Sequence, residues 1–258
     1  MTHVFPADFH LAEAGAPAAR TALVLHGGGG PQTVAPIVGH VASTMHALAP
    51  THPGWDGTSL DETIASVADL AGAYLSLLAD RGDLDVVVIG SSIGGWIALE
   101  MAVQAAADER YAGVIGAAVV IDGVGAVVDG QPIADFFALD ARGLAEAAWH
   151  DPQRGYRDPA LFTDEQRAIR QGNARTMAAV AGSSMSDPGL LARLGGVTSP
   201  TLMVWGASDR VVTPAYGRAL ADAVSGAEYV EIAAAGHLPH LEAPDATWAA
   251  IDPFLSRV

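Results

Sequence analysis

Residues 86–97 read VVVIGSSIGGWI, and this stretch decides the fold class. A run of β-branched residues leads into a turn rich in glycine and serine, and the residues from Ile97 onward favour a helix. The run shows no polar alternation, which is typical of a strand buried on both faces. Residues 90–94 match G-x-S-x-G, with Ser92 at the centre. A serine at such a strand-to-helix turn is lifted above the sheet edge, which predicts an accessible nucleophile.

Similar apolar runs recur along the chain and alternate with helix-like segments. The runs are residues 21–25, 47–49, 85–89, 114–121, 201–205 and 228–232. They predict an α/β fold, a mostly parallel central sheet with helices on both faces. Helical spacing is found over residues 98–107, 215–224 and 246–255. A further helix is predicted to begin at a capping box, with Ser59 as N-cap and Glu62 three residues later.

The alternation of strands and helices breaks between residues 123 and 198. This segment contains scattered aromatic residues, prolines and arginines, and it has no strand signal. We therefore expect a core made of residues 1–122 and 199–258 and a small helical cap inserted as residues 123–198. The alternative is a single long crossover connection. Acidic residues are interspersed with the arginines of this segment, so surface ion pairs are the default expectation for them.

Composition narrows the classes of function. Of the 258 residues, 50% are hydrophobic, which predicts a large core. The formal net charge is −16, which disfavours nucleic acid or an anionic membrane as partner. The chain has no cysteine, which excludes thiolate catalysis and cysteine-bound metals. No secretory signal is apparent, and the longest apolar run is far shorter than the ~20 residues that span a bilayer. We expect a soluble, cytoplasmic protein that acts on a small molecule, with its oligomeric state undetermined.

A serine hydroxyl needs a base that takes its proton and a carboxylate that orients the base. His237 follows the run at residues 228–232 and stands beside a glycine, so it is the candidate base, with His240 as the competitor. Asp209 follows the run at residues 201–205, so it is the candidate acid. Asp122 ends the neighbouring run and could fill the same space. The order Ser92, Asp209, His237 is one of the known orders of a catalytic triad.

A glycine-rich loop, His26-Gly27-Gly28-Gly29-Gly30, follows the first strong strand. It cannot be a lysine-containing phosphate loop, because the chain has no lysine, and it lacks the dinucleotide-binding spacing. Its exposed backbone N–H groups are suited to an oxyanion. We expect Gly28 to be one donor, with Gly27 or Gly29 as alternatives, and Ile93 at the start of the helix to be the other. His26 is expected to brace the loop.

Together, the motifs HGGGGP, GSSIGG, WGASDRVV and AAGHLPHLE resemble those of the α/β-hydrolase family, and the resemblance extends from residue 21 to residue 255. It implies the α/β-hydrolase fold, with the insertion in the place of the family's cap. It also implies roles for five residues: nucleophile for Ser92, acid for Asp209, base for His237, and oxyanion donors for Gly28 and Ile93. Neither a metal nor an organic cofactor is needed for this chemistry.

The substrate pocket is less well defined by the sequence. Its candidates are Gly27, Trp55, Phe136 and Phe137. Trp55 could instead cover the edge of the core, and the aromatic residues could form a small core of the cap. The loop around Trp55 contains an extra residue, Asp56, relative to the tighter G-x-G-x-S of many family members.

The resemblance implies a serine hydrolase that cleaves a small-to-medium carboxylic ester or a lactone through an acyl-enzyme. The same triad occurs in C–C bond hydrolases of diketo acids and in cofactor-free haloperoxidases, which remain alternatives. A further alternative is a small-ligand receptor without turnover.

Overall fold

A computed structural model describes residues 5–258 of the chain. Its main sheet has seven strands in the order β1-β3-β2-β4-β5-β8-β9. The strands are β1 (Leu11–Ala14), β2 (Thr21–Leu25), β3 (His46–Pro50), β4 (Val86–Ser91), β5 (Ile115–Ile121), β8 (Thr201–Gly206) and β9 (Glu228–Ile232). All neighbouring pairs are parallel except β1 and β3, which are antiparallel. The predicted α/β class is confirmed.

Strand β1 was not expected from the sequence. It is short, its middle residues Ala12 and Glu13 are exposed, and it lies at the edge of the sheet. An edge strand of this kind lacks the continuous apolar run by which the buried strands were recognised.

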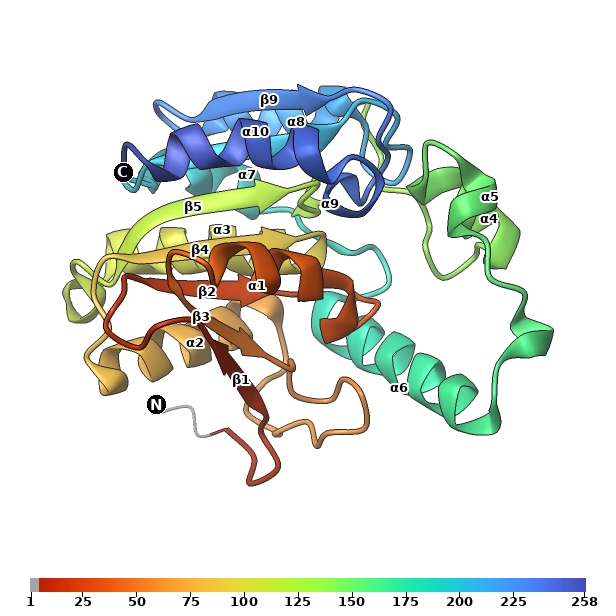
Figure 1. The fold of residues 1–258 in the computed structure, drawn as a ribbon, viewed down its shortest axis with the longest axis horizontal. Helices are drawn as coiled ribbons and strands as arrows, with labels where there is room; N and C mark the ends of the chain where they lie inside the picture. Colours follow the sequence, from red (N-terminus) through yellow and green to blue (C-terminus); the bar gives the residue numbers. More distant parts are fainter. Residues whose placement is uncertain (1–4) are drawn as a thin grey trace.

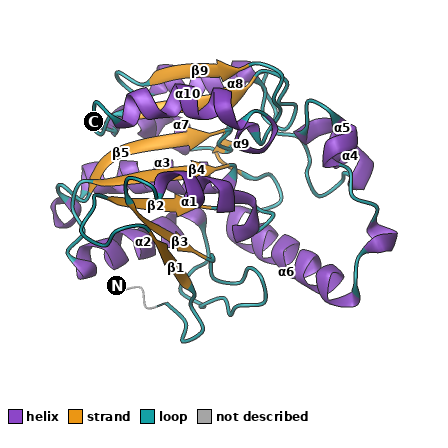
Figure 2. Ribbon diagram, viewed as in Figure 1, coloured by secondary structure: helices purple, strands orange, loops and turns teal. Residues whose placement is uncertain are grey.

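Helices cover both faces of the sheet (Figure 1; Figure 2). The helices outside the insertion are α1 (Ala35–Val41), α2 (Val67–Arg81), α3 (Ile93–Ala107), α8 (Pro214–Ala223), α9 (Pro239–Glu242) and α10 (Pro244–Leu255). Helices α2, α3 and α8 share one hydrophobic cluster with Leu23 and Leu25 of β2, whereas α1 and α10 share another with Ala22 and Val24. Alternate residues of the same strand therefore enter opposite layers, which is why the run is apolar throughout.

The predicted start of α2 is wrong. The helix begins at Val67, and its N-cap is Ser66, whose hydroxyl accepts a hydrogen bond from the N–H of Asp69 at 3.1 Å. Ser59 instead donates to the carboxylate of Asp8. Ser59 precedes Ser66 by two helical turns, so both serines stand at the same phase of the apolar pattern, and periodicity alone does not separate them.

Residues 123–198 lie between β5 and β8 in the chain. They form α4 (Ala141–Ala148), α5 (Pro152–Gly155), α6 (Asp164–Ala181) and α7 (Leu190–Arg193). Figure 1 shows α4, α5 and α6 beyond the carboxyl ends of β4 and β5. The segment also contains a parallel pair of two-residue strands, β6 (Gly125–Ala126) and β7 (Ser186–Asp187), although no strand signal was found. Strands of this length are too short to show a period.

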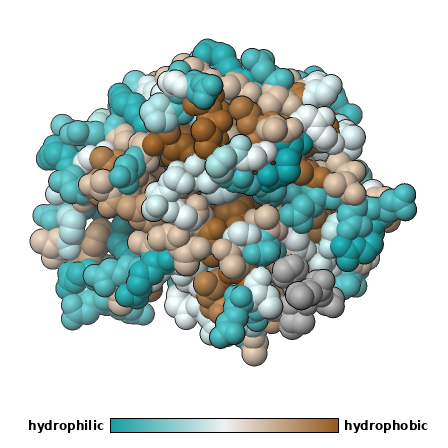
Figure 3. Space-filling model, turned by 180° about the vertical axis from the view of Figure 1, so that it is seen from behind, coloured by the Kyte–Doolittle hydropathy of each residue, from teal (hydrophilic) through white to brown (hydrophobic). Residues whose placement is uncertain are grey.

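Short 3₁₀ helices complete the fold at Pro31–Val34, Glu109–Tyr111, Pro159–Leu161 and Leu194–Gly196. Within residues 5–258, no helix is both long enough and apolar enough to span a membrane. On the face drawn in Figure 3, areas of hydrophobic residues are interrupted by hydrophilic ones.

Candidate active site

Ser92 occupies a sharp turn between β4 and α3. Its backbone has φ 59° and ψ −118°, a conformation that residues other than glycine rarely adopt. The turn requires close backbone contacts on both sides. A Cβ on Gly90 would lie 2.0 Å from the carbonyl oxygen of Gly94, and one on Gly94 would lie 2.2 Å from that of Leu25. The two glycines therefore make possible the strained turn that presents the Ser92 hydroxyl.

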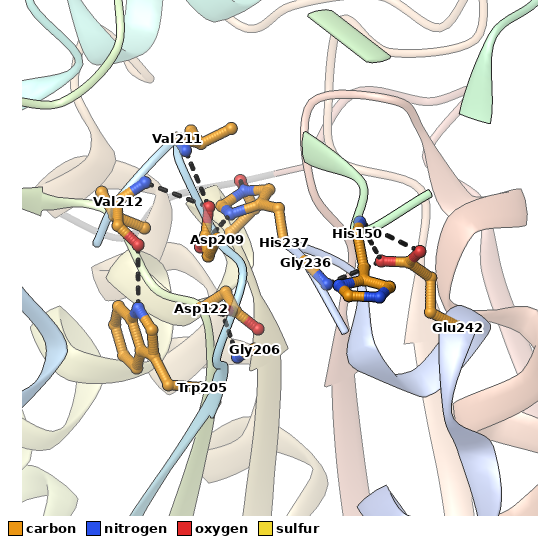
Figure 4. Close-up of polar contacts among 11 residues, drawn as sticks. Asp122, His150, Trp205, Gly206, Asp209, Val211, Val212, Gly236, His237 and Glu242 are labelled. Carbon is orange, nitrogen blue, oxygen red and sulfur yellow. Dashed lines mark hydrogen bonds and ion pairs between the residues drawn. The ribbon is translucent and has the colours of Figure 1, made fainter. Parts of the chain in front are cut away.

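The structure brings Ser92, His237 and Asp209 together from distant parts of the chain. Nε2 of His237 lies 2.8 Å from Oγ of Ser92, and Nδ1 lies 2.8 Å from Oδ2 of Asp209. The other carboxylate oxygen of Asp209 accepts hydrogen bonds from the N–H groups of Val211 and Val212, at 2.7 and 3.2 Å (Figure 4). With a proton on Nδ1 donated to Asp209, Nε2 faces the serine as an acceptor.

The acid and the base stand on loops at the carboxyl ends of β8 and β9, two adjacent strands. These loops touch directly, because a Cβ on Gly206 would lie 1.8 Å from the carbonyl oxygen of Gly236. Both Asp209 and His237 are buried, with 2% and 7% of their surface exposed. The close contact fixes the acid loop against the base loop and excludes water from the pair.

Asp122, the alternative acid, lies beside the pair but makes no hydrogen bond with His237. Its Oδ1 accepts from the N–H of Gly206 at 2.9 Å (Figure 4). Its Oδ2 is buried and has no hydrogen-bond partner within residues 5–258. Burial, together with the nearby charge of Asp209, raises the pKa of Asp122 well above the ordinary range of an aspartate. The raised pKa favours the neutral form of Asp122 next to the carboxylate that orients the base.

Asp122, Asp209 and His237 also place one ligand atom each within 4.8 Å, a spacing that a metal ion could use. Asp209 and His237 are, however, hydrogen bonded to each other through two of these atoms. The hydrogen bond between Asp209 and His237, with Asp122 buried beside them, accounts for this spacing without an ion.

The glycine-rich loop lies next to the nucleophile. A Cβ on Gly27 would lie 3.1 Å from Cβ of Ser92, whereas one on Gly28 would lie 2.5 Å from the sulfur of Met177. The carbonyl of Gly28 accepts from Nε1 of Trp55 at 3.2 Å. Within the described chain, the N–H of Gly28 donates to no backbone carbonyl. Ile93 is the first residue of α3, so its N–H has no carbonyl in the preceding turn.

Two buried histidines brace this loop. Nε2 of His26 accepts from the N–H of His52 at 2.9 Å, so the proton is on Nδ1, which donates to the carbonyl of Gly27 at 2.7 Å. Nε2 of His52 donates to the carbonyl of His26, and its Nδ1 accepts from the hydroxyl of Tyr74. Burial lowers the pKa of His26 to about 4 and holds that of His52 well below its usual value. Both rings are neutral supports rather than acid–base groups.

His240, the competing base, points elsewhere. Its Nε2 lies 2.9 Å from the carbonyl oxygen of Thr33, and burial lowers its pKa to about 4. Glu242, two residues further along the chain, accepts hydrogen bonds from three backbone N–H groups. Two of them belong to Gly236 at 2.6 Å and to His150 at 3.0 Å (Figure 4). The third belongs to Asp151 at 3.3 Å. One carboxylate thus joins the base loop to the segment after α4.

A cavity of about 690 Å³ opens above Ser92 and His237. Its lining is mostly apolar and includes Gly27, Gly28 and Phe136. Trp55 and Phe137 do not line it, so the structure does not support their assignment to the pocket. Trp55 is fully buried beneath the glycine-rich loop, and Phe137 is partly exposed and packs edge-on against Phe136.

One face of α6 forms a wall of the cavity. The residues of this face are Gln166, Ile169, Arg170, Asn173, Ala174 and Met177. They follow the spacing of a single helical stripe, a signal that the sequence contained and that we did not use. Asn173 also exchanges two hydrogen bonds with Asp56, at 2.8 and 3.1 Å, which fixes the loop with the extra residue against the helix.

Solved structures of similar fold cover nearly the whole chain. An esterase of Thermogutta terrifontis has a TM-score of 0.72 at 19% identity and covers 96% of this chain and 93% of its own. An enol-lactonase of Burkholderia xenovorans LB400 has a TM-score of 0.72 at 22% identity, and the match covers 96% of each chain. A 2-hydroxy-6-oxo-6-phenylhexa-2,4-dienoate hydrolase of Rhodococcus sp. strain RHA1 has a TM-score of 0.70 at 23% identity. The match covers 96% of this chain and 93% of the hydrolase. These identities indicate a shared fold only.

No curated protein matches the chain in sequence. The family model described as the alpha/beta hydrolase family matches residues 22–250, which include the strand-to-helix turn, both loops of the candidate acid and base, and the whole insertion. The chain is therefore a member of the alpha/beta hydrolase family.

Proposed function

We propose that the protein is a serine hydrolase that cleaves a small-to-medium carboxylic ester or a lactone. The observation that carries this proposal is the unbroken line of hydrogen bonds from Ser92 through His237 to Asp209, with both distances at 2.8 Å. Such a line gives a hydroxyl a base and gives the base a fixed tautomer. The folds shared with an esterase and an enol-lactonase agree with this choice of reaction.

In the proposed reaction, Oγ of Ser92 attacks the carbonyl carbon while Nε2 of His237 takes the hydroxyl proton. The oxyanion is bound by the N–H groups of Gly28 and Ile93, and one such donor is typically worth about 3 kcal/mol. The tetrahedral intermediate collapses, and His237 gives the proton to the departing alkoxide, leaving an acyl-enzyme. Water, deprotonated by the same base, attacks the acyl group and releases the acid and free Ser92.

The size and polarity of the cavity set the substrate class within this proposal. Pockets of ~300–1,000 Å³ with apolar walls hold small organic ligands, and the volume of about 690 Å³ lies within that range. We assign the apolar wall to the acyl or alcohol part of the substrate. In this scheme residues 123–198 act as the substrate-binding cap of the core formed by residues 1–122 and 199–258.

A fluorophosphonate probe and a nitrophenyl ester test the proposal together. The wild type should be labelled and should turn over the ester, and Ser92→Ala should lose both. Ser91→Ala is the matched control, because Ser91 is the adjacent residue, is buried, and its Oγ has no hydrogen-bond partner within residues 5–258. Equal labelling of Ser92→Ala and wild type would reject Ser92 as nucleophile.

A further inference from the structure

Two arginines of the insertion, Arg157 and Arg170, line the cavity. The chain has 29 acidic residues and 13 arginines. Ion pairs are made by Arg20, Arg81, Arg110, Arg167, Arg193, Arg218 and Arg257. Within residues 5–258, six arginines make none, contrary to the surface pairing expected from the sequence for those of the insertion: Arg142, Arg154, Arg157, Arg170, Arg175 and Arg210. Of these six, only Arg157 and Arg170 line the cavity.

Both guanidinium groups are held in place while keeping free N–H groups. The guanidinium of Arg170 lies over the ring of Phe162, 4.2 Å from the centroid, a contact that uses its flat face. Nη1 of Arg157 donates to the carbonyl oxygens of Arg154 and Tyr156, at 2.8 and 3.0 Å. The remaining N–H groups have the planar arrangement that matches a carboxylate.

Arg170 lies at a defined place along the cavity wall. It shares the inner stripe of α6 with Met177, whose sulfur lies against the oxyanion loop at Gly28. Their separation of seven positions in the sequence corresponds to roughly 10 Å along the helix axis. A carboxylate at Arg170 would therefore be separated from the carbonyl at Ser92 by an apolar spacer.

The local charge of the cavity opposes that of the molecule. Apart from His237, the charged side chains among the described lining residues are Asp56, Arg157 and Arg170, and Asp56 is hydrogen bonded to Asn173. The formal net charge of the chain is −16, a field that repels anions. Among the described lining residues, the two arginines outnumber the single carboxylate of Asp56, so the local formal charge of the cavity is positive.

We propose that the cavity binds a monoanionic substrate, an ester or lactone with a carboxylate at the end remote from the scissile carbonyl, and that Arg157 and Arg170 bind this carboxylate. This inference rests on the proposed function for the reacting end of the substrate. The arginines supply recognition only and take no part in bond breaking.

The test compares the mono-4-nitrophenyl ester of adipic acid with 4-nitrophenyl hexanoate, which lacks the charge. The wild type should prefer the anionic ester in kcat/KM, and Arg157→Gln and Arg170→Gln should each reduce the ratio of anionic to neutral by about tenfold. Arg175→Gln is the matched control, since it removes the same charge from an exposed arginine of α6 that does not line the cavity. Added salt should weaken the preference.

A binding measurement separates this inference from the proposed function. In the Ser92→Ala background, calorimetry compares adipic acid monoanilide with hexananilide, with and without Arg157→Gln and Arg170→Gln. Hydrolysis of the neutral ester without any anionic preference would overturn the inference and leave the proposed function intact. Arginine-dependent binding of the anionic anilide without hydrolysis of either ester would support the anion site and reject the hydrolase. An anionic preference that both lining variants retain, or that Arg175→Gln lowers equally, would refute the assignment to these arginines.

Discussion

Replacement of Asp122 by asparagine should change how the stability of the protein depends on pH. Asp122 is fully buried, accepts one hydrogen bond from Gly206 and has a second oxygen without a partner. Burial and the charge of Asp209 raise the pKa of Asp122 well above the ordinary value. Asparagine has nearly the same shape and does not ionise, so Asp122→Asn removes the titration while keeping an acceptor for Gly206.

The expected magnitude follows from proton linkage. Above about pH 4, the unfolded chain has lost the Asp122 proton, whereas the folded protein keeps it. The folded state then binds one proton more, so the free energy of unfolding falls with rising pH by about 1.4 kcal/mol per unit. This loss begins near pH 4 and ends where pH passes the folded pKa. Asp122→Asn lacks this titration, so its free energy of unfolding should exceed that of the wild type by a growing amount as the pH rises from about 4 to the folded pKa.

Urea unfolding of both proteins at intervals from pH 4 to pH 8 measures this difference. Asp80→Asn, which removes an exposed carboxylate of α2, serves as the comparison for a surface site. If the new amide changes the hydrogen bonding, it adds a constant to the difference in free energy of unfolding between variant and wild type. It does not change how that difference varies with pH. A difference between wild type and Asp122→Asn that stays constant over the whole range would refute a neutral Asp122.

Three further substitutions test other parts of the site. Gly94→Ala should prevent the strand-to-helix turn, because its Cβ would lie 2.2 Å from the carbonyl oxygen of Leu25. Gly39→Ala is the control and should be neutral or stabilising, because its Cβ would have no described atom within 4 Å. Thermal unfolding compares the stability of the two variants. Asp209→Asn should lower kcat by about 10⁴-fold with little loss of stability, and a change below tenfold would contradict its role. Glu242→Gln sets an amide NH₂ against backbone N–H donors, so it should destabilise the fold by about 1–3 kcal/mol and lower kcat, as urea unfolding and ester kinetics would show.

The parts of the fold that were predictable are those governed by local rules. A strand buried on both faces must be apolar throughout, so β2, β4, β5 and β8 were visible in the sequence. Parallel strands place their carboxyl ends at one edge, which is why Ser92 and Asp209 could be expected near each other. Strand β1 was not predicted, because half of it faces solvent. The start of α2 was predicted at the wrong serine, because Ser59 and Ser66 are equivalent N-cap candidates in the sequence.

The walls of the cavity depended on tertiary contacts that no local pattern contains. Trp55 and Phe137 were plausible pocket residues by type, but one is covered by the glycine-rich loop and the other packs beside Phe136. The pairing of arginines was equally undetermined, because acidic neighbours in sequence need not be neighbours in space. The inner stripe of α6 was readable as a period, yet only the packing of the helix shows that it faces the cavity.

The bonds of Glu242 restrict how a substrate can reach the nucleophile. The backbone amides of Gly236, His150 and Asp151 converge on one carboxylate, and the N–H of His237 donates to Ala148 at 2.7 Å. An outward swing of the stretch after α4 would pull the imidazole away from the serine. Any movement that admits substrate and keeps Nε2 of His237 within 2.8 Å of Oγ of Ser92 must therefore leave these bonds intact.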